Sequence, residues 1–299
     1  MRVLVTGAGG FVGRRLVAAL AARGDAVLAH DRELDVTDAA RVREAVAKLR
    51  PDAIAHLAAI ASVAECAREP VRAFRVNVLG TRALLEAALR ESPRARVLLV
   101  STAAIYGSAP LGSAGFDESA GLRPGSDYAR TKASADLLAA DYAERGLAVV
   151  RARPFNHTGA GRPESYVEAR LARDVAEIAA SRREPRLELP NPTSQRDFLH
   201  VDDVIDAYLA LLGPDVAPGA YNVASGEAVT MRELARRLCS LAAVNATLAE
   251  TSDPLRPPDA TLGVSHKLRA ATGWRPRRTL DDALRELLAE QRLRLSGSD

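Results

Sequence analysis

The sequence predicts an α/β fold, in which a doubly wound parallel sheet carries a second, smaller C-terminal lobe. Three observations support this fold class. Short apolar runs alternate with longer amphipathic segments from residue 2 to residue 152, glycines directly follow the first apolar run, and Pro, Gly, Asn and Thr become frequent after Arg153. Alternating strands and helices imply right-handed crossovers and a parallel sheet covered on both faces, whose strands should be apolar throughout.

Each element follows from the spacing of its apolar residues. The apolar runs short enough for strands lie at 2–6, 26–30, 53–57, 96–101 and 147–152. The segments with helical spacing between them lie at 11–23, 39–49, 71–90 and 128–145. Beyond residue 153, helical patterns separated by loops lie at 166–181, 202–212, 230–242 and 279–292.

These elements divide the chain into two predicted parts. Residues 1–152 build the domain around the parallel sheet, and segments near 197–224 return to it. Residues 153–196 and 225–295 form the smaller lobe, which we expect to bind the substrate, and residues 296–299 are a tail.

The composition excludes several classes of protein. Net charge is +3, only three of the 41 basic residues are lysines, and the arginines alternate with acidic residues rather than forming a basic run with aromatics. This pattern argues against a nucleic-acid partner. No apolar stretch reaches the roughly 18 residues of a membrane span, and the N-terminus does not resemble a signal peptide. The two cysteines lie far apart and outside any metal-binding spacing, so we expect reduced thiols, no metal and a cytoplasmic location.

The glycines after the first predicted strand have the spacing of a dinucleotide-binding turn. In the segment VLVTGAGGFVG they stand at Gly7, Gly10 and Gly13, between a strand and a helix. Gly7 permits the tight turn, Gly10 lets backbone N–H groups approach a diphosphate, and Gly13 lets helix and strand pack closely. Because the helix N-terminus also favours an anion, this segment predicts bound NAD or NADP.

An acidic residue at the end of the second predicted strand bears on which cofactor is bound. Asp31 is placed to accept hydrogen bonds from the adenosine ribose, and its charge repels a 2′-phosphate, which favours NAD. Arg32 beside it could instead bind that phosphate, so NADP stays open. The alternative is that both residues form a solvated strand end. Asp35 and Val36 are further candidates to border the adenine.

Tyr128 and Lys132 form a Y-x-x-x-K pair in the segment SDYARTKAS. On a helix this spacing places both side chains on one face, where the ammonium should lower the pKa of the phenol. The pair could then move a proton to or from a sugar oxygen while hydride is transferred. Thr102, after the fourth predicted strand, could donate a hydrogen bond to the reacting carbonyl. Ser101 is the rival for that role, and a simple loop cap is the alternative for Thr102.

Several motifs resemble one known family in both sequence and order. They are TGAGGFVG, HLAA at 56–59, NVLGT at 77–81, STAAIYG, YARTK, RPFNHTG at 153–159, QRDFLHVDDV at 195–204 and YNVASG at 221–226. Together they resemble the extended short-chain dehydrogenase/reductase family of nucleotide-sugar epimerases, dehydratases and reductases. The likeness covers nearly the whole chain.

The resemblance implies a Rossmann-type NAD(P)-binding domain and a homodimer joined through two helices per subunit. It implies that Thr102, Tyr128 and Lys132 are catalytic and that Asn156 borders both nicotinamide and sugar. It assigns Arg196 and Arg256 to the substrate diphosphate, which a guanidinium can bind bidentately, with surface ion pairs as the alternative. The other implied cofactor contacts are Phe11, Val12, Leu57, Ala58, Ala59, Asn77 and Pro154.

Within this family the residues favour reduction of a sugar ketone. The family's dehydratases carry an Asp-Glu pair directly after the catalytic Thr, whereas this chain has Ala103 and Ala104, which cannot transfer protons. The segments RPFNHTGAGRPES and LRPPDATLGVSHKLRAATGWRP resemble the reductases that convert GDP-4-dehydro-6-deoxy-D-mannose to GDP-D-rhamnose. In that pattern Ala160 replaces a proline and Arg162 a glutamine.

Three other activities remain as alternatives. The segment HDRELDVTD resembles reductases of dTDP-linked 4-keto-6-deoxy sugars. A nucleotide-sugar 4-epimerase would use the same residues with a retained NAD. Some proteins of this fold only bind NAD(P) as sensors, but the intact Tyr128–Lys132 pair argues against a role without catalysis.

Overall fold

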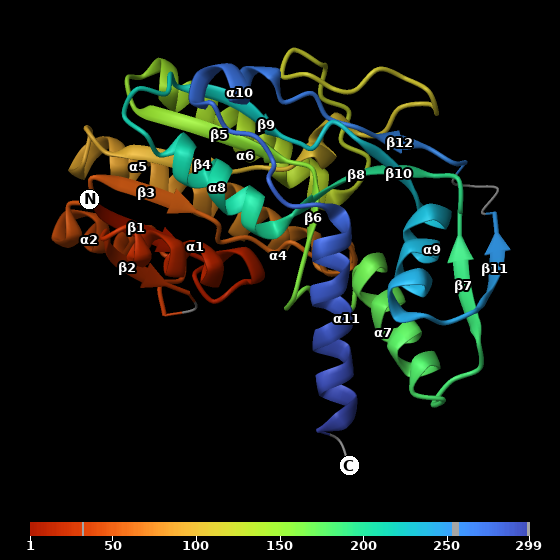
Figure 1. Cartoon of the computed structure of the whole chain (residues 1–299). Helices are drawn as coiled ribbons and strands as arrows, with labels where there is room; N and C mark the ends of the chain where they lie inside the picture. The colour runs from red at the N-terminus through yellow and green to blue at the C-terminus, as the bar shows by residue number, and fades with distance from the viewer. Residues whose placement is uncertain (32, 253–256, 298–299) are drawn as a thin grey trace.

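The computed structural model describes residues 1–31, 33–252 and 257–297, and it has the predicted α/β architecture (Figure 1). Six parallel strands form the large sheet in the order β2-β1-β3-β4-β5-β9. They are β1 (Arg2–Thr6), β2 (Ala26–His30), β3 (Ala53–His56), β4 (Arg96–Val100), β5 (Ala148–Pro154) and β9 (Gly219–Val223). The order reverses direction at β1 and β3, so the carboxyl ends of the central strands open onto a crevice.

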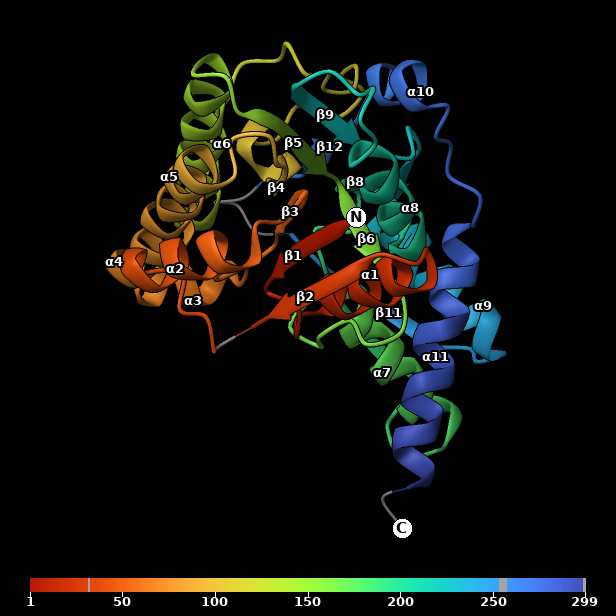
Figure 2. The same cartoon turned by 90° about the vertical axis from the view of Figure 1, so that its left-hand side faces the viewer.

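Helices cover both faces of this sheet, as Figure 2 shows. On one face lie α1 (Phe11–Ala22) and α8 (Val201–Leu211), and on the other α2 (Ala39–Leu49), α5 (Thr81–Glu91) and α6 (Asp127–Glu144). The alternation of side chains along β1 explains both cores, because Val3 and Val5 pack toward α1 and α8 while Leu4 packs toward α2 and α5. Strand β1 is therefore apolar on both sides, as predicted, whereas β5 also carries Arg151 and Arg153, which pair with Asp136.

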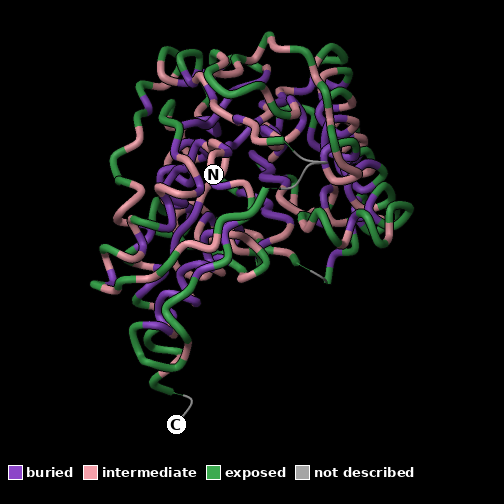
Figure 3. The backbone as a smooth tube through the Cα atoms, turned by 90° about the vertical axis from the view of Figure 1, so that its right-hand side faces the viewer, coloured by how far each residue is buried: buried purple, intermediate pink, exposed green. Residues whose placement is uncertain are grey.

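The smaller lobe has its own sheets and its own apolar core. Strand β8 (Gln195–His200) pairs with β6 (Asn156–Thr158), β10 (Ala228–Thr230) and β12 (Ala260–Thr261), while β7 (Arg186–Pro190) pairs with β11 (Thr247–Thr251). Helices α7 (Val167–Ala179), α9 (Met231–Ala242) and α11 (Leu280–Ser296) pack around this core. Buried positions concentrate inside the molecule, while α11 projects from the body and ends among exposed residues (Figures 1 and 3).

The structure corrects the predicted helix at 71–90. It consists of α4 (Pro70–Phe74), the π-helical η1 (Arg75–Gly80) and α5. The Thr81 hydroxyl donates to the carbonyl of Asn77, and Gly80 packs against Val36, where a Cβ would lie 2.7 Å from a Val36 methyl. The spacing of apolar residues does not reveal such tertiary contacts and indicates only that the segment is helical.

Two short helices were not predicted, and one changes the domain division. They are α3 (Val63–Arg68) and α10 (His266–Thr272). Leu268 of α10 and Trp274, which the prediction places in the smaller lobe, are buried in the core of the large domain, and the Trp274 indole donates to the carbonyl of Asp203. Conversely, residues 197–200 belong to β8 and pair within the smaller lobe rather than with the large sheet. None of the described helices has the length and hydropathy needed to cross a bilayer.

Candidate active site

A cleft of about 1440 Å³ opens at the carboxyl ends of the central strands, between the large domain and the smaller lobe. Most of the predicted site residues line it, although they come from distant parts of the sequence. They are Gly7, Gly10, Phe11, Val12, Gly13, Asp31, Asp35, Val36, Leu57, Ala58, Ala59, Thr102, Tyr128, Lys132, Pro154, Asn156 and Arg196. Arg32 and Arg256 lie outside the described residues.

The glycine turn forms a cradle that side chains would fill. Gly7 has φ +71°, and a Cβ there would lie 2.7 Å from the backbone nitrogen of Ala58. At Gly13 a Cβ would lie 2.1 Å from the carbonyl oxygen of Gly7. Gly10 caps α1, no side chain bonds to the cap, and the first turn of α1 holds no acidic residue. The free N–H groups and the helix dipole therefore suit the diphosphate of a dinucleotide.

Acidic residues stand at the β2 end of the cleft. The Asp31 carboxylate lies against Gly9, where a Cβ would be 2.5 Å from its Oδ2, so close packing of the turn depends on glycine there as well. Asp35 is already engaged, because its Oδ1 accepts from the backbone nitrogen and the hydroxyl of Thr37 at 2.9 and 2.8 Å. These hydrogen bonds lower the pKa of Asp35. Asp31 is thus the better placed of the two carboxylates to accept from a ribose.

Asn77, a predicted cofactor contact, is hydrogen-bonded to protein groups in this structure. It is buried outside the cleft lining, and its amide nitrogen donates to the Ile60 carbonyl at 3.1 Å and to the Thr131 hydroxyl at 2.9 Å. Its Oδ1 accepts from the Ile60 backbone nitrogen at 2.8 Å. The side chain therefore supports the cleft wall at Ile60 and ties it to α6.

The three predicted catalytic residues meet at one end of the cleft. Thr102 follows β4 and caps η2 (Ala103–Tyr106), where its hydroxyl accepts from the Ala104 backbone nitrogen at 3.2 Å, and it lies beside Tyr128 near the start of α6, where it opposes the rise in the pKa of that phenol. Lys132 follows one helical turn later and is buried, with its Nζ donating to the carbonyl oxygen of Val100 at 2.5 Å. The Y-x-x-x-K spacing thus brings both groups to the cleft through one helix face.

The expected lowering of the Tyr128 pKa by Lys132 is not what this arrangement produces. Burial raises the pKa of Tyr128 to about 12, and the groups that oppose the rise are the Thr102 hydroxyl and the Arg162 guanidinium. Burial also lowers the pKa of Lys132 to about 8, with the carboxylate of Asp136 opposing that change. The ammonium is directed to the Val100 carbonyl, so its charge serves the β4 end rather than the phenol.

On the side of the smaller lobe, Asn156 and Arg196 line the cleft as predicted. The Asn156 amide donates to the Asp197 carbonyl at 3.3 Å, which orients its oxygen independently of any ligand. Arg196 is paired with Asp259 at 2.8 Å and also donates to the Gln195 carbonyl at 2.8 Å. A substrate diphosphate would therefore have to share this guanidinium with a carboxylate.

Sequence reasoning missed several residues that line the same cleft. His157, Tyr166 and Tyr208 come from β6, from the residue before α7 and from α8. Burial, together with the nearby Arg162 charge, lowers the pKa of His157 to about 4, so this imidazole is neutral. The Tyr208 side chain is fully buried, and its hydroxyl finds no hydrogen-bond partner among the described residues. No local sequence pattern identifies Tyr208 as a cleft residue, because its apolar neighbours on α8 indicate only a core helix.

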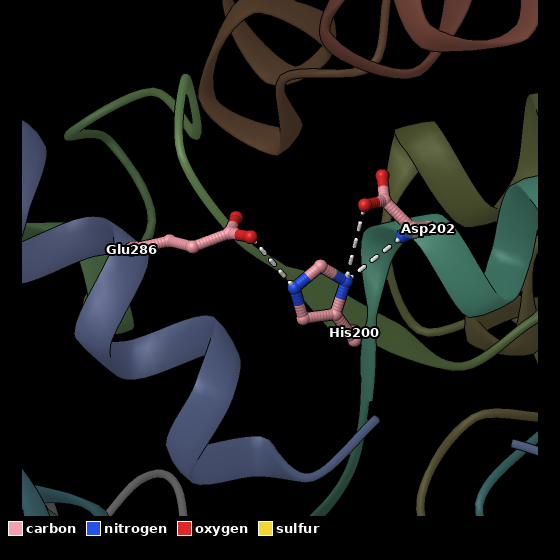
Figure 4. A group of neighbouring side chains, drawn as sticks. All are labelled: His200, Asp202 and Glu286. Carbon is pink, nitrogen blue, oxygen red and sulfur yellow. Dashed lines mark hydrogen bonds and ion pairs between the residues drawn. The ribbon is translucent and has the colours of Figure 1, made fainter. Parts of the chain in front are cut away.

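A group of His200, Asp202 and Glu286 connects the two parts of the chain near the cleft (Figure 4). The three side chains have metal-binding chemistry, but both imidazole nitrogens of His200 are engaged. Its Nδ1 accepts from the Asp202 backbone nitrogen at 3.1 Å, so its Nε2 is the donor to Glu286 at 3.1 Å. Arg15 supplies the positive charge, at 3.1 Å from Asp202 and 3.9 Å from Glu286. The group therefore acts as an ionic link between α1, α8 and α11.

One cleft holds a glycine cradle for a diphosphate, a neighbouring threonine and tyrosine, and a buried lysine. These features define an NAD(P)-dependent oxidoreductase. Comparison with known proteins gives the same class. The model of the NAD dependent epimerase/dehydratase family matches residues 3–224. This chain therefore belongs to the NAD dependent epimerase/dehydratase family.

Individual relatives are similar over almost the full chain. GDP-6-deoxy-D-mannose reductase from Pseudomonas aeruginosa is 35% identical over 97% of this chain and 96% of its own length. The structure of RMD from the same species, complexed with NADPH, matches 98% of this chain and 99% of that chain with a TM-score of 0.91 and 33% identity. The UDP-glucose 4-epimerase of Thermus thermophilus in complex with NAD, at 30% identity, covers 98% of this chain and 99% of that chain with a TM-score of 0.86.

Proposed function

We propose that this protein reduces the C4 ketone of a nucleotide-activated 4-keto-6-deoxy sugar with NAD(P)H, converting GDP-4-dehydro-6-deoxy-D-mannose to GDP-D-rhamnose. The observation that carries the choice of reaction is that Tyr128, whose phenol can donate a proton, shares the cleft with Ala103 and Ala104, which cannot exchange one. Burial raises the pKa of Tyr128, so the phenol is protonated in the described arrangement, as a proton donor in ketone reduction must be. The similarity to GDP-6-deoxy-D-mannose reductase supports the choice of sugar.

Several residues of the cleft have separate roles in this reaction. When bound, NAD(P)H supplies the hydride that adds to C4 of the sugar. Tyr128 donates its phenolic proton to the ketone oxygen as the carbon–oxygen double bond becomes single, so the product is an alcohol. Thr102 lies beside the phenol and opposes the rise in its pKa, while Lys132, one turn along α6, donates to the carbonyl of Val100 at the end of β4. Asn156 bounds the sugar on the opposite side of the cleft.

The residues after Thr102 support reduction over dehydration. Ala103 and Ala104 both line the cleft, at the place where the elimination of water would need an acid and a base. A methyl group cannot exchange a proton, so the cleft offers no side chain for that step at these positions. The geometry supports a reductase whose substrate already carries the ketone when it binds.

A panel of substrates at 340 nm tests the proposal. GDP- and dTDP-linked 4-keto-6-deoxy sugars are each supplied with NADPH and with NADH, and we expect stoichiometric consumption of reduced cofactor with the GDP sugar. Because Asp31 faces the adenosine end and Arg32 adjoins it, we propose that both cofactors are accepted, with NADH somewhat favoured. The competing 4-epimerase would instead contain retained NAD and interconvert UDP-glucose and UDP-galactose without net oxidation. That second outcome would overturn the reductase proposal.

We also propose that the chain works as a cytoplasmic homodimer. Large apolar side chains are exposed on one helical surface, with Val71 at 74% and Phe74 at 46% exposure on α4 and Leu137 at 59% on α6. These helices contact each other, and two helices per subunit are what the family resemblance implies for a dimer. Both cysteines are unpaired thiols, as a reducing compartment allows. Light scattering of the wild type and of Leu137→Arg tests the dimer, which the charge should dissociate.

A further inference from the structure

Arg162 is a nearly buried cation in the wall of the cleft. It lies in the loop between β6 and α7 and is 8% exposed. Its Nε donates to the Glu168 carboxylate at 2.9 Å, and Glu168 is itself 3% exposed. A guanidinium carries five N–H donors, and among the described residues only the Nε–H of Arg162 has an acceptor. The Nη donors are thus left for whatever occupies the cleft.

The surrounding structure holds this guanidinium in one place. It stacks on the ring of Tyr166, 3.4 Å from the ring centroid, and lies 5.4 Å from the ring centroid of Phe11. The preceding loop is anchored to α11, because the backbone nitrogens of Ala160 and Gly161 donate to Glu286 and Glu290 at 3.2 and 2.6 Å. Figure 4 shows Glu286 reaching from α11 toward His200. A cation fixed by stacking and by its loop loses little conformational entropy on binding.

The position of Arg162 identifies the kind of ligand it meets. Phe11 is the first residue of α1, and the N-terminus of that helix forms the glycine cradle for a diphosphate. A guanidinium over Phe11 therefore stands beside the same anion site from the side of the smaller lobe. Planar N–H donors match a diphosphate bidentately, and Glu168 occupies the opposite edge of the guanidinium without blocking its Nη groups.

We propose that Arg162 completes the cofactor cradle by binding the diphosphate of the dinucleotide. The backbone of the glycine turn then contacts the diphosphate from the large domain and Arg162 contacts it from the smaller lobe, so the bound cofactor joins the two. Arg196, paired with Asp259 elsewhere in the cleft, remains the candidate for the substrate diphosphate. The proposal rests on the assignment of this cleft to NAD(P), and the test separates the two claims.

Binding titrations of the intact protein with NADPH, ADP-ribose and GDP test this role without using turnover. We expect Arg162→Gln to raise the Kd for NADPH and for ADP-ribose at least tenfold and to leave the Kd for GDP within twofold of wild type. The salt dependence of NADPH binding should also decrease. Arg162→Lys should weaken NADPH less. The matched control is Arg170→Gln on α7, because Arg170 makes a single 4.0 Å contact with Asp174 and does not line the cleft.

A second variant keeps the test valid if Arg162→Gln folds poorly. Removing the guanidinium leaves the Glu168 charge buried and unpaired, which is destabilising. The double variant Arg162→Gln/Glu168→Gln removes that charge and should fold while keeping the tenfold loss for NADPH. NADPH binding within twofold of wild type in the double variant would overturn the proposal, as would a loss confined to GDP. A wild type that binds neither NADPH nor ADP-ribose would instead refute the NAD(P) assignment.

Discussion

Replacing Tyr208 with Phe should stabilise the protein, although it removes a polar group from the core. The Tyr208 hydroxyl is buried between α8 and the large sheet without a hydrogen-bond partner among the described residues, and its burial raises its pKa. A buried polar group without a partner costs about 1–3 kcal/mol. Removing the oxygen leaves the ring packing intact, so we expect the free energy of unfolding to rise by roughly 1 kcal/mol.

Tyr106→Phe provides the matched control with the opposite sign. This second buried tyrosine donates to Asn222 at 2.7 Å and accepts from Arg153 at 2.8 Å. Removing its hydroxyl leaves both partners unsatisfied and should lower the free energy of unfolding by about 1–3 kcal/mol. Urea denaturation monitored by circular dichroism measures both variants, and at this chain size 1 kcal/mol corresponds to a shift in Tm of roughly 2–4 °C.

The pair of variants tests the reasoning more sharply than either alone. The prediction would be contradicted if Tyr208→Phe lowered the free energy of unfolding by more than 1 kcal/mol while Tyr106→Phe left it unchanged. Repeating the denaturation with saturating NADPH tests whether the bound cofactor accepts a hydrogen bond from the Tyr208 hydroxyl. Because Tyr208 lines the cleft, a bound cofactor that accepts from it would remove the advantage of the Phe variant.

Three further results are expected. Tyr128→Phe should lower turnover by ~10²-fold or more while the Kd for NADPH stays within twofold, and near-normal turnover would remove this phenol from the mechanism. The pKa of Lys132 is lowered from 10.5 to about 8 by burial, so the unfolded chain binds more protons between these values and stability should rise from pH 8 to pH 10. Lys132→Met should flatten that rise when the two denaturation curves are compared, and an unchanged slope would contradict a buried ammonium. Burial lowers the pKa of His56 from 6.5 to about 3, so the unfolded chain protonates first and stability should fall as the pH drops below 6.5. His56→Gln should reduce that acid-dependent loss, and an equally steep loss would assign it to other groups.

Much of the candidate site was accessible from local patterns. Gly7 and Gly13 stand where a positive φ or a close backbone approach excludes a side chain. A helix places Tyr128 and Lys132 on one face, whatever surrounds the helix. The ends of parallel strands meet along one edge, so residues after β1, β4 and β5 were expected to share a crevice. The boundaries of most elements agree with the predicted ones to within about three residues for the same reason.

Other features depended on contacts that no short segment contains. Burial raises the pKa of Tyr128, although the spacing alone predicts a lowered one, and Lys132 donates to the carbonyl of Val100. The helix predicted at 71–90 contains the π-helical η1, in which Asn77 bonds to Ile60 and Thr131. Trp274, which the prediction places in the smaller lobe, packs in the core of the large sheet, and its indole donates to the carbonyl of Asp203 on α8.

The sequence by itself determined the fold class, the glycine cradle and the tyrosine–lysine pair, because backbone conformation and periodicity are properties of adjacent residues. The protonation of Tyr128 and the position of Arg162, which lies over Phe11 from the side of the smaller lobe, depend on the tertiary structure. Electrostatic energies and burial depend on every group that folds around a side chain, and those groups come from distant parts of the chain.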